Sequence, residues 1–360
     1  MYLKHISLSN FKSYQDIQFA FTEKVNCVVG PNGSGKTNIL DAIHYLSFCK
    51  SYFSSQDLFS INFNSDYFSI HGEFINQKTD NTFKVACIYK NGRKTVKVNN
   101  KEYERLSDHI GLLPLIMVSP YDNDIINEGS DLRRKFFDMI ISQFDKEYLQ
   151  QLIAYQKIIL QRNIFLKQYF SSPLPEHSLL EIYNQQLIPL GNYIFEARKQ
   201  FINAILSDFQ DYYHYLSSGS EIVNICYDSQ LAQTPFYEGL IKNQAQDFKT
   251  GFSNFGIHKD DFHFFIDEKP VKRFGSQGQQ KSVALALKLS HYKYIISKRE
   301  LKPILLLDDI FDKLDNNRIA QLLNLVNKQH FGQVFITDTD EKRLKEILDF
   351  HKIENEIFLI

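Results

Sequence analysis

One eight-residue segment, GPNGSGKT at residues 30–37, limits the folds that this chain can adopt. It matches the pattern GxxxxGK[ST] in full, and it follows the short apolar run VNCVV at residues 25–29. Behind it, residues 38–48 place apolar side chains at helical spacing. A buried strand, a glycine-rich turn and a helix in this order are typical of an α/β phosphate-binding fold, in which backbone N–H groups and the helix N-terminus hold the phosphates.

This motif predicts the residues that contact a bound nucleotide. Lys36 is expected to reach the β- and γ-phosphates, and Thr37 to supply a hydroxyl oxygen to Mg²⁺. A chance glycine-rich turn is the alternative, and the flanking strand and helix speak against it. The expected phosphate-binding residues are Gly30, Pro31, Asn32, Gly33, Ser34, Gly35, Lys36 and Thr37.

A second motif, ILLLDD at residues 304–309, lies near the other end of the chain. Its unbroken apolar run predicts a strand of a parallel sheet, buried on both faces. Ligands bind at the carboxyl ends of such strands. Asp308 is therefore expected to hold Mg²⁺, directly or through water, and Asp309 to orient or deprotonate the attacking water. The alternative is a pair of carboxylates that cap a turn.

A third motif, SQGQQK at residues 276–281, opens another amphipathic stretch. Ser276 followed by Gln279 is a capping box, which is the purely structural interpretation. The functional interpretation is a second anion site at a helix N-terminus, complementary to a triphosphate. The position of Ser276, 32 residues before Asp308, favours the functional interpretation.

The remaining patterns predict how the chain is organised. Short alternating runs at residues 67–98 indicate antiparallel strands, and Asn91-Gly92 between two of them is a strong hairpin signal. Beyond Pro120, apolar residues step by three or four from 132 to 163, which predicts one long helix. A break at residues 171–175 precedes a second helix at about 178–216, with a kink expected at Pro189.

A length of 360 residues predicts two or three lobes. We expect an ATPase lobe that is built from residues 1–118 and 251–360. Residues 119–250 would form a helical lobe inserted between these two parts.

Composition excludes several classes of protein. The chain has 41 Lys and Arg against 42 Asp and Glu, so it is neither a globally basic DNA-binding protein nor a polyacidic one, although a local basic face is compatible with this balance. Its 4 cysteines form no CxxC pair, which argues against a zinc ribbon or a redox motif. Without a signal peptide or a long apolar run, we expect a cytoplasmic protein.

Cations gather around the hairpin signal at Asn91-Gly92, and phosphate neutralisation needs several cations on one face. An edge strand protected by solvated lysines is the alternative. Residues 133–135, RRK, are a second candidate, and HKDD at 258–261 fits either an ATPase site or a turn. The candidate DNA-binding residues are Lys90, Arg93, Lys94 and Lys97, with Lys84 and Lys101 beside them.

The three motifs, followed by the Leu314-Asp315 loop, resemble in order those of ATP-binding-cassette proteins. In detail, SQGQQK in place of LSGGQ and LLLDDIFDKLD at residues 305–315 resemble the RecF family of bacterial DNA replication and repair proteins. The resemblance covers essentially the whole chain, without a coiled-coil arm. It is also carried by NFKSY at 10–14, GRKTVKVNNKEYERLSDHIG at 92–111, RRKFFD at 133–138, LQRN at 160–163 and GIHKDD at 256–261.

This resemblance implies an α/β protein with a P-loop ABC-type, SMC-head-like ATPase lobe and an inserted helical lobe. It implies ATP and Mg²⁺ as cofactors and an ATP-dependent homodimer, in which Ser276 of one subunit contacts the γ-phosphate bound by Lys36 of the other. Gly278, Gln279 and Asp315 are further expected nucleotide contacts.

The resemblance also implies slow, DNA-stimulated hydrolysis that times a clamp on duplex or gapped DNA. RecR and RecO would be partners in loading RecA at gaps. No switch histidine follows residues 333–337, so Asp338 and Asp340 are candidates for that role.

Three alternatives belong to other classes. A transporter ATPase subunit would associate with membrane permeases, and the insertion beyond Pro120 and the SQGQQK motif speak against it. An SMC-like structural head would carry long heptad arms. A P-loop kinase would need no motif at Ser276.

Overall fold

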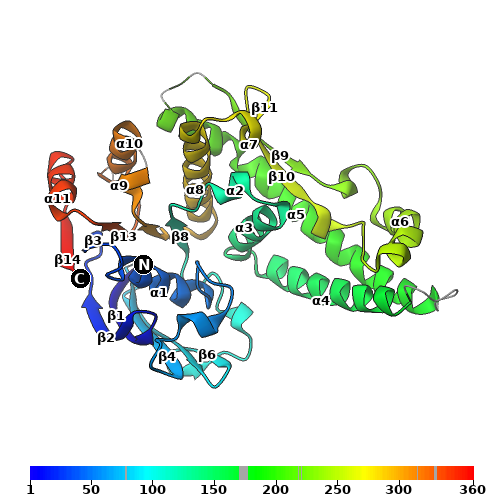
Figure 1. Ribbon diagram of the computed structural model, residues 1–360, viewed down its shortest axis with the longest axis horizontal. Helices are drawn as coiled ribbons and strands as arrows, with labels where there is room; N and C mark the ends of the chain where they lie inside the picture. The colour runs from blue at the N-terminus through cyan, green and yellow to red at the C-terminus, as the bar shows by residue number, and fades with distance from the viewer. Residues whose placement is uncertain (78, 170–176, 218, 220, 314, 328–330) are drawn as a thin grey trace. The chain divides into compact units, whose positions relative to one another are not determined.

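The computed structural model describes residues 1–77, 79–169, 177–217, 219, 221–313, 315–327 and 331–360 (Figure 1). The chain divides into two compact units. The first consists of Met1–Asp122, Tyr212–Gly219 and Ala284–Ile360, and the second of Asn123–Asp211 and Ser220–Val283. Residues 251–283, which the sequence assigns to the ATPase lobe, therefore group with the second unit.

A parallel sheet forms the centre of the first unit, with the strand order β14-β3-β13-β12-β8. Its apolar runs are buried on both faces, as the sequence predicts for a parallel sheet. Because all five strands point the same way, the residues that follow β3, β12 and β13 lie at one edge of the sheet. The strands are β3 (Val25–Val29), β8 (Leu115–Val118), β12 (Ile304–Leu307), β13 (Val334–Asp338) and β14 (Asn355–Leu359).

A six-stranded antiparallel sheet, in the order β2-β1-β4-β5-β6-β7, is the other sheet of this unit. Helix α1 (Lys36–Phe48) contacts strands of both sheets (Figure 1). Its side chains are almost all buried. The hairpin between β5 and β6 turns at Asn91 and Gly92, with φ of 52° and 74°, and this confirms the hairpin prediction. The strands are β1 (Tyr2–Phe11), β2 (Tyr14–Ala20), β4 (Tyr67–Asn76), β5 (Asn81–Lys90), β6 (Arg93–Val98) and β7 (Lys101–Glu102).

The first unit also contains the helices near the C-terminal end. These are α9 (Ile310–Lys313), α10 (Asn316–Asn327) and α11 (Glu341–Phe350), while the 3-10 turns η1 (Asp57–Ser60) and η2 (Leu106–Asp108) lie in its N-terminal part. Helix α8 (Gln277–Arg299) begins among residues of the second unit and ends among those of the first.

The second unit is mainly helical, and one sequence prediction about it is wrong. The single helix expected at 132–163 is two helices, α3 (Ser130–Ser142) and α4 (Lys146–Gln168). Asp145 begins α4 by accepting a 2.8 Å hydrogen bond from the backbone N–H of Tyr148. The apolar spacing continues across the break because both helices bury one face, so periodicity alone does not reveal the cap.

The second predicted helix is confirmed as α5 (His177–Ser217), which contains Pro189, while the break expected at 171–175 lies outside the described residues. The other elements of this unit are α2 (Asp124–Asn127), β9 (Val223–Asp228), η3 (Gln230–Ala232), α6 (Phe236–Thr250), η4 (Ile257–Lys259), β10 (Asp261–Ile266), β11 (Lys269–Pro270) and α7 (Val271–Phe274). None of the helices in the described part of the chain combines the length and the apolar character that crossing a bilayer requires.

Candidate nucleotide-binding site

The phosphate-binding motif forms a tight loop between β3 and α1. Gly33 and Gly35 have φ of 83° and 108°, in the region that glycine adopts without strain. A Cβ atom on Gly35 would lie 2.7 Å from the Tyr14 hydroxyl and 2.9 Å from Ser13 Oγ. Both the backbone angle and the close approach of the NFKSY segment therefore require glycine at position 35.

Lys36 is held inside this loop. Its side chain is buried, and its ammonium donates hydrogen bonds to the carbonyl oxygens of Gly30, at 2.8 Å, and Pro31, at 3.1 Å. Two neutral carbonyls leave the full positive charge of Lys36 at the loop. Because α1 begins at this residue, the charge and the positive end of the helix dipole act in the same place.

Thr37 and Asp308 meet at the carboxyl edge of the parallel sheet, although they are far apart in the sequence. The Thr37 hydroxyl lies 3.0 and 3.1 Å from the two carboxylate oxygens of Asp308. The Thr337 hydroxyl, at the end of β13, donates to the same carboxylate at 2.8 Å. These hydroxyl and carboxylate oxygens are the hard ligands that Mg²⁺ prefers, so the residues present suit that cation.

Burial raises the pKa of Asp308 to about 6, and the neighbouring charge of Asp309 adds to this effect. Hydrogen bonds from Thr337 and Thr37 and the charge of Lys36 act in the opposite direction. A buried carboxylate with a raised pKa is stabilised by a cation, and this arrangement therefore favours binding of a metal ion at Asp308.

Asp309 adopts a strained backbone conformation beside this carboxylate. Its φ is 44°, in the left-handed region, and its backbone N–H donates to the Thr337 hydroxyl at 2.8 Å. Left-handed non-glycine residues that are fixed by their surroundings are frequent at functional sites. Thr337 thus orients both acidic residues, and the sequence analysis did not single it out. Its position at the end of the apolar run 333–337 was the signal that could have identified it.

Asp338 and Asp340, close after Thr337 in the chain, have structural partners. Asp338 is buried and accepts a 2.6 Å hydrogen bond from the Arg343 guanidinium. Asp340 begins α11 by accepting from the backbone N–H of Arg343 at 3.0 Å. The carbonyl of Asp338 accepts from the backbone N–H of Gly30 at 3.3 Å, which links this turn to the phosphate-binding loop.

The SQGQQK motif has the capping box that its spacing predicts. The Ser276 backbone N–H donates to Gln279 Oε1 at 2.7 Å, and the Gln279 backbone N–H donates to Ser276 Oγ at 3.2 Å. The Gln279 amide also donates to Glu221 at 2.7 Å, while Ser276 is exposed and Gly278 half-buried. An exposed Ser276 at a helix N-terminus is accessible to a ligand from another molecule.

Asp315 caps the next helix. Its carboxylate accepts a hydrogen bond from the backbone N–H of Arg318 at 3.0 Å. The same carboxylate forms an ion pair with the Arg318 guanidinium. Leu314, which precedes it in the expected loop, lies outside the described residues.

The motifs RRKFFD, LQRN and GIHKDD form ion pairs with other residues of the second unit. Arg133 pairs with Asp261 at 2.6 Å, and the fully buried Arg198 pairs with Asp260 at 2.8 Å. Nδ1 of His258 and the Tyr155 hydroxyl share a hydrogen bond of 2.9 Å. Burial lowers the pKa of the His258 ring to about 4. These contacts give the motifs a structural role in this unit.

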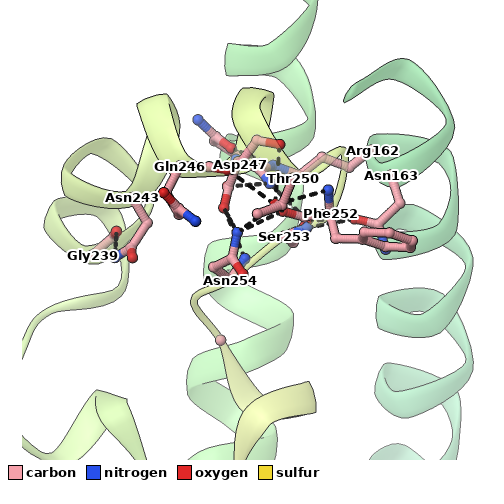
Figure 2. Close-up of polar contacts among 12 residues, drawn as sticks. Arg162, Asn163, Gly239, Asn243, Gln246, Asp247, Thr250, Phe252, Ser253 and Asn254 are labelled. Carbon is pink, nitrogen blue, oxygen red and sulfur yellow. Dashed lines mark hydrogen bonds and ion pairs between the residues drawn. The ribbon is translucent and has the colours of Figure 1, made fainter. Parts of the chain in front are cut away.

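Figure 2 shows the part of this network around LQRN. The guanidinium of Arg162 donates to Asp247 at 2.7 Å and to Ser253 Oγ at 2.7 Å, and the amide oxygen of Asn163 accepts from both the backbone N–H and the hydroxyl of Ser253. Both members of the Arg162–Asp247 pair are completely buried. The contacts join α4, α6 and the loop at residues 251–256.

The candidate DNA-binding cations are divided between the two faces of the β5–β6 hairpin. Lys94 lies on the face that packs on α1, where it forms a 2.7 Å ion pair with Asp57 and lies over the Tyr45 ring. Lys90, Arg93 and Lys97 project from the opposite face, on which Arg93 pairs with Glu102 at 3.0 Å.

The structure therefore brings the first two motifs together through Lys36, Thr37, Asp308 and Asp309. Tyr14 is a further residue that the sequence analysis missed. Its hydroxyl is buried against Gly35 without a hydrogen-bond partner among the described residues, and burial raises its pKa to about 12.

Comparisons with known proteins agree with this architecture. Residues 2–356 match the RecF/RecN/SMC N terminal domain family. A DNA replication and repair protein RecF from Flavobacterium johnsoniae is 44% identical over 349 residues, which is 97% of this chain and 97% of the relative. One from Bacteroides thetaiotaomicron is 42% identical over 97% of this chain and 94% of its own length.

A solved structure described as the recombination mediator protein RecF-ATPrS in the RecFOR pathway has a TM-score of 0.88 at 30% identity, over 100% of this chain and 96% of the other. The Smc head domain of Pyrococcus furiosus has a TM-score of 0.56 at 17% identity, over 97% and 91%, and at that identity it supports the fold alone. The expected SMC-head-like ATPase fold is confirmed.

Proposed function

This chain belongs to the RecF family of DNA replication and repair proteins, and on that basis we propose that it is a DNA-dependent ATPase that acts as a clamp in recombinational repair and replication restart. It binds ATP at the loop formed by residues 30–37 and holds DNA as an ATP-induced dimer. Solved structures of the family are described with ATP bound and as part of the RecFOR pathway, which supports this role.

The contact of Thr37 with Asp308 is the observation that carries the proposal. It joins the phosphate-binding loop to the acidic strand end within 3.0 Å. Mg²⁺ would be held by the Thr37 hydroxyl and the Asp308 carboxylate, and it supplies neutralisation of the phosphate charge when bound. Lys36 would exchange its two carbonyl acceptors for the β- and γ-phosphate oxygens, since a charged acceptor makes the stronger hydrogen bond.

Hydrolysis needs a residue that positions water in line with the γ-phosphate. Asp309 is assigned this task because it adjoins Asp308 and is fixed by Thr337. Ser276 of a second copy would complete the site, with Gly278 and Gln279 on the same helix N-terminus. Asp315 would be a further nucleotide contact. Slow turnover, stimulated by DNA, would then set the lifetime of the dimer on DNA.

The partners follow from family membership. The protein would bind duplex or gapped DNA and interact with RecR and RecO, so that RecA loads at gaps.

Lys36→Ala tests the nucleotide step. We expect loss of ATP-dependent dimerisation by size-exclusion chromatography with light scattering, and loss of ATP-dependent retention on gapped DNA. Lys342→Ala, an exposed lysine of α11, is the matched control. Dimerisation and DNA retention that are unaffected by Lys36→Ala would refute the clamp mechanism.

Asp309→Asn tests the hydrolytic step. We expect ATP binding to persist while hydrolysis slows by 10²-fold or more, as is typical for loss of a positioned base. The dimer should then accumulate in ATP. Rapid turnover by this variant would remove Asp309 from its assigned role.

A further inference from the structure

The outer face of the six-stranded sheet, opposite to α1, carries four of the six cations that gather around the hairpin. Along β5, Val85 and Cys87 are buried, so Lys84, Ala86 and Lys90 alternate to the other side. The register Ala86↔Lys97 and Lys90↔Arg93 places β6 cations on the same face. The outer-face cations are Lys84, Lys90, Arg93 and Lys97.

Lys84 and Lys90 do not act as protection for a sheet edge. Such lysines belong to edge strands, where they block pairing with another chain. Strand β5, which supplies Lys84 and Lys90, lies inside the sheet with β4 on one side and β6 on the other. Among the described residues, neither lysine forms an ion pair, and Lys90 lies over the Tyr67 ring at 5.6 Å.

A hollow of about 630 Å³ opens on this same face. Its lining includes the small side chains of Ser7 and Ala86 and the cations Lys84 and Lys97. The other polar groups of the lining are His5, Gln18, His71, Glu73 and Asn100. The face therefore offers hydrogen-bond donors around a depression rather than a flat apolar surface.

The spacing of the cations fits a duplex. Lys84 and Lys97 form one pair, because Lys97 lies opposite Ala86, two residues along β5 from Lys84. Lys90 and Arg93 form the second pair, beside the turn. From Lys97 to Arg93 the strand extends about 13 Å at about 3.3 Å per residue. This is close to the width of the DNA major groove, about 12 Å, and phosphates line both sides of that groove.

Carboxylates on the outer face reduce its net positive charge, but they leave both pairs of cations able to bind phosphate. Glu73 lies opposite Lys84 in the register, Asp16 is on the distant strand β2, and Glu102 pairs with Arg93. The Arg93–Glu102 ion pair is exposed, so it contributes little to stability. The Arg93 guanidinium can therefore exchange the Glu102 carboxylate for a DNA phosphate.

We propose that this outer face of β5 and β6 is the surface that binds the DNA backbone, with Lys84 and Lys97 on one side of a groove and Lys90 and Arg93 on the other. The proposal rests on the DNA-binding function proposed above and assigns its location. Lys94, which faces α1 and Asp57, is excluded from the contact.

The test measures binding of a fluorescent 30-base-pair duplex to the full-length protein in Mg-ATP between 50 and 200 mM salt. Each phosphate contact contributes about 0.9 to the slope of log K against log salt concentration. Lys84→Gln/Lys97→Gln and Lys90→Gln/Arg93→Gln should each lower the slope by about 1.8. Each should weaken binding by up to about 60-fold at 0.1 M salt, if counterion release accounts for the contact.

Two controls separate location from general charge. Lys342→Gln/Lys345→Gln removes the same charge from exposed positions of α11, and Lys94→Gln removes a cation from the opposite face of the hairpin. Both should leave the slope unchanged, although Lys94→Gln should lower the melting temperature. Wild-type slopes in both outer-face variants, with the wild-type protein binding DNA normally, would overturn the location alone. Absence of ATP-dependent DNA binding by the wild-type protein would instead overturn the proposed function.

Discussion

Asp308→Asn should stabilise the nucleotide-free protein while it abolishes the response to Mg-ATP. Folding raises the pKa of Asp308 from 3.8 to about 6, so the folded state favours the protonated carboxyl. The free energy of unfolding therefore falls as pH rises from about 4 to about 6, because Asp308 ionises less readily in the folded state than in the unfolded state. Above that range the full loss of stability is present. A shift of about two units corresponds to about 3 kcal/mol at pH 7.5.

The amide removes this penalty but is an imperfect replacement. It can still accept a hydrogen bond from Thr37 or Thr337 through one oxygen, while its NH₂ group needs an acceptor. We therefore expect a net gain of about 1–3 kcal/mol. For a unit of roughly 200 residues this raises the melting temperature by roughly 2–10 °C.

The assay is thermal unfolding at pH 7.5 with and without Mg-ATP, and Asp338→Asn is the matched control. Asp338 has the same side chain and is equally buried at the end of the neighbouring strand, but it is paired with Arg343 at 2.6 Å. Neutralising Asp338 should lower the melting temperature, because it breaks the ion pair with the Arg343 guanidinium. With ligand at 100 times its dissociation constant, the wild-type protein should gain about 2.7 kcal/mol, and Asp308→Asn much less.

Two results would refute this reasoning. A nucleotide-free melting temperature that falls in Asp308→Asn, as in the control, would show that the ionised carboxylate stabilises the fold. A Mg-ATP shift equal to that of the wild-type protein would show that Asp308 does not hold the metal ion.

Three further predictions concern other parts of the molecule. Gly35→Ala should weaken ATP binding at least tenfold by calorimetry, because Cβ would collide with Tyr14 and the left-handed angle costs about 1–2 kcal/mol; unchanged affinity would contradict the loop geometry. Arg162→Met should lower the free energy of unfolding by about 3–5 kcal/mol in urea denaturation, since it leaves Asp247 buried and unpaired, and Arg162→Met/Asp247→Leu should recover much of that loss. The affinity of the ATP-bound protein for Mg²⁺, measured by titration, should fall about tenfold per pH unit below about 6, because Asp308 becomes protonated; a constant affinity from pH 7 to pH 5 would contradict the assignment of Asp308 as a metal ligand.

Local sequence identified the parts of the site that depend on neighbouring residues. Glycines at fixed positions between an apolar strand and a helix predict the phosphate-binding loop, because the required backbone angles are a local property. The hairpin at Asn91-Gly92 was correct for the same reason. The break between α3 and α4 was missed, since Asp145 caps a helix within a continuous apolar pattern.

The tertiary structure decided which residues act together over long distances in the chain. Thr37 and Asp308 meet only because β3 and β12 belong to one parallel sheet, whose carboxyl ends share an edge. Thr337 joins them because β13 lies between β3 and β12 in that sheet.

The same distinction applies to the cations of the hairpin. The sequence placed Lys90, Arg93, Lys94 and Lys97 in one short segment, but it could not show which of them share a surface. The pleat of β6 and its register with β5 turn Lys94 toward Asp57 and the others away from it. Local sequence therefore determined the chemistry that this protein carries. Strand pairing and burial determined which groups meet and with what charge, because both depend on contacts between distant segments.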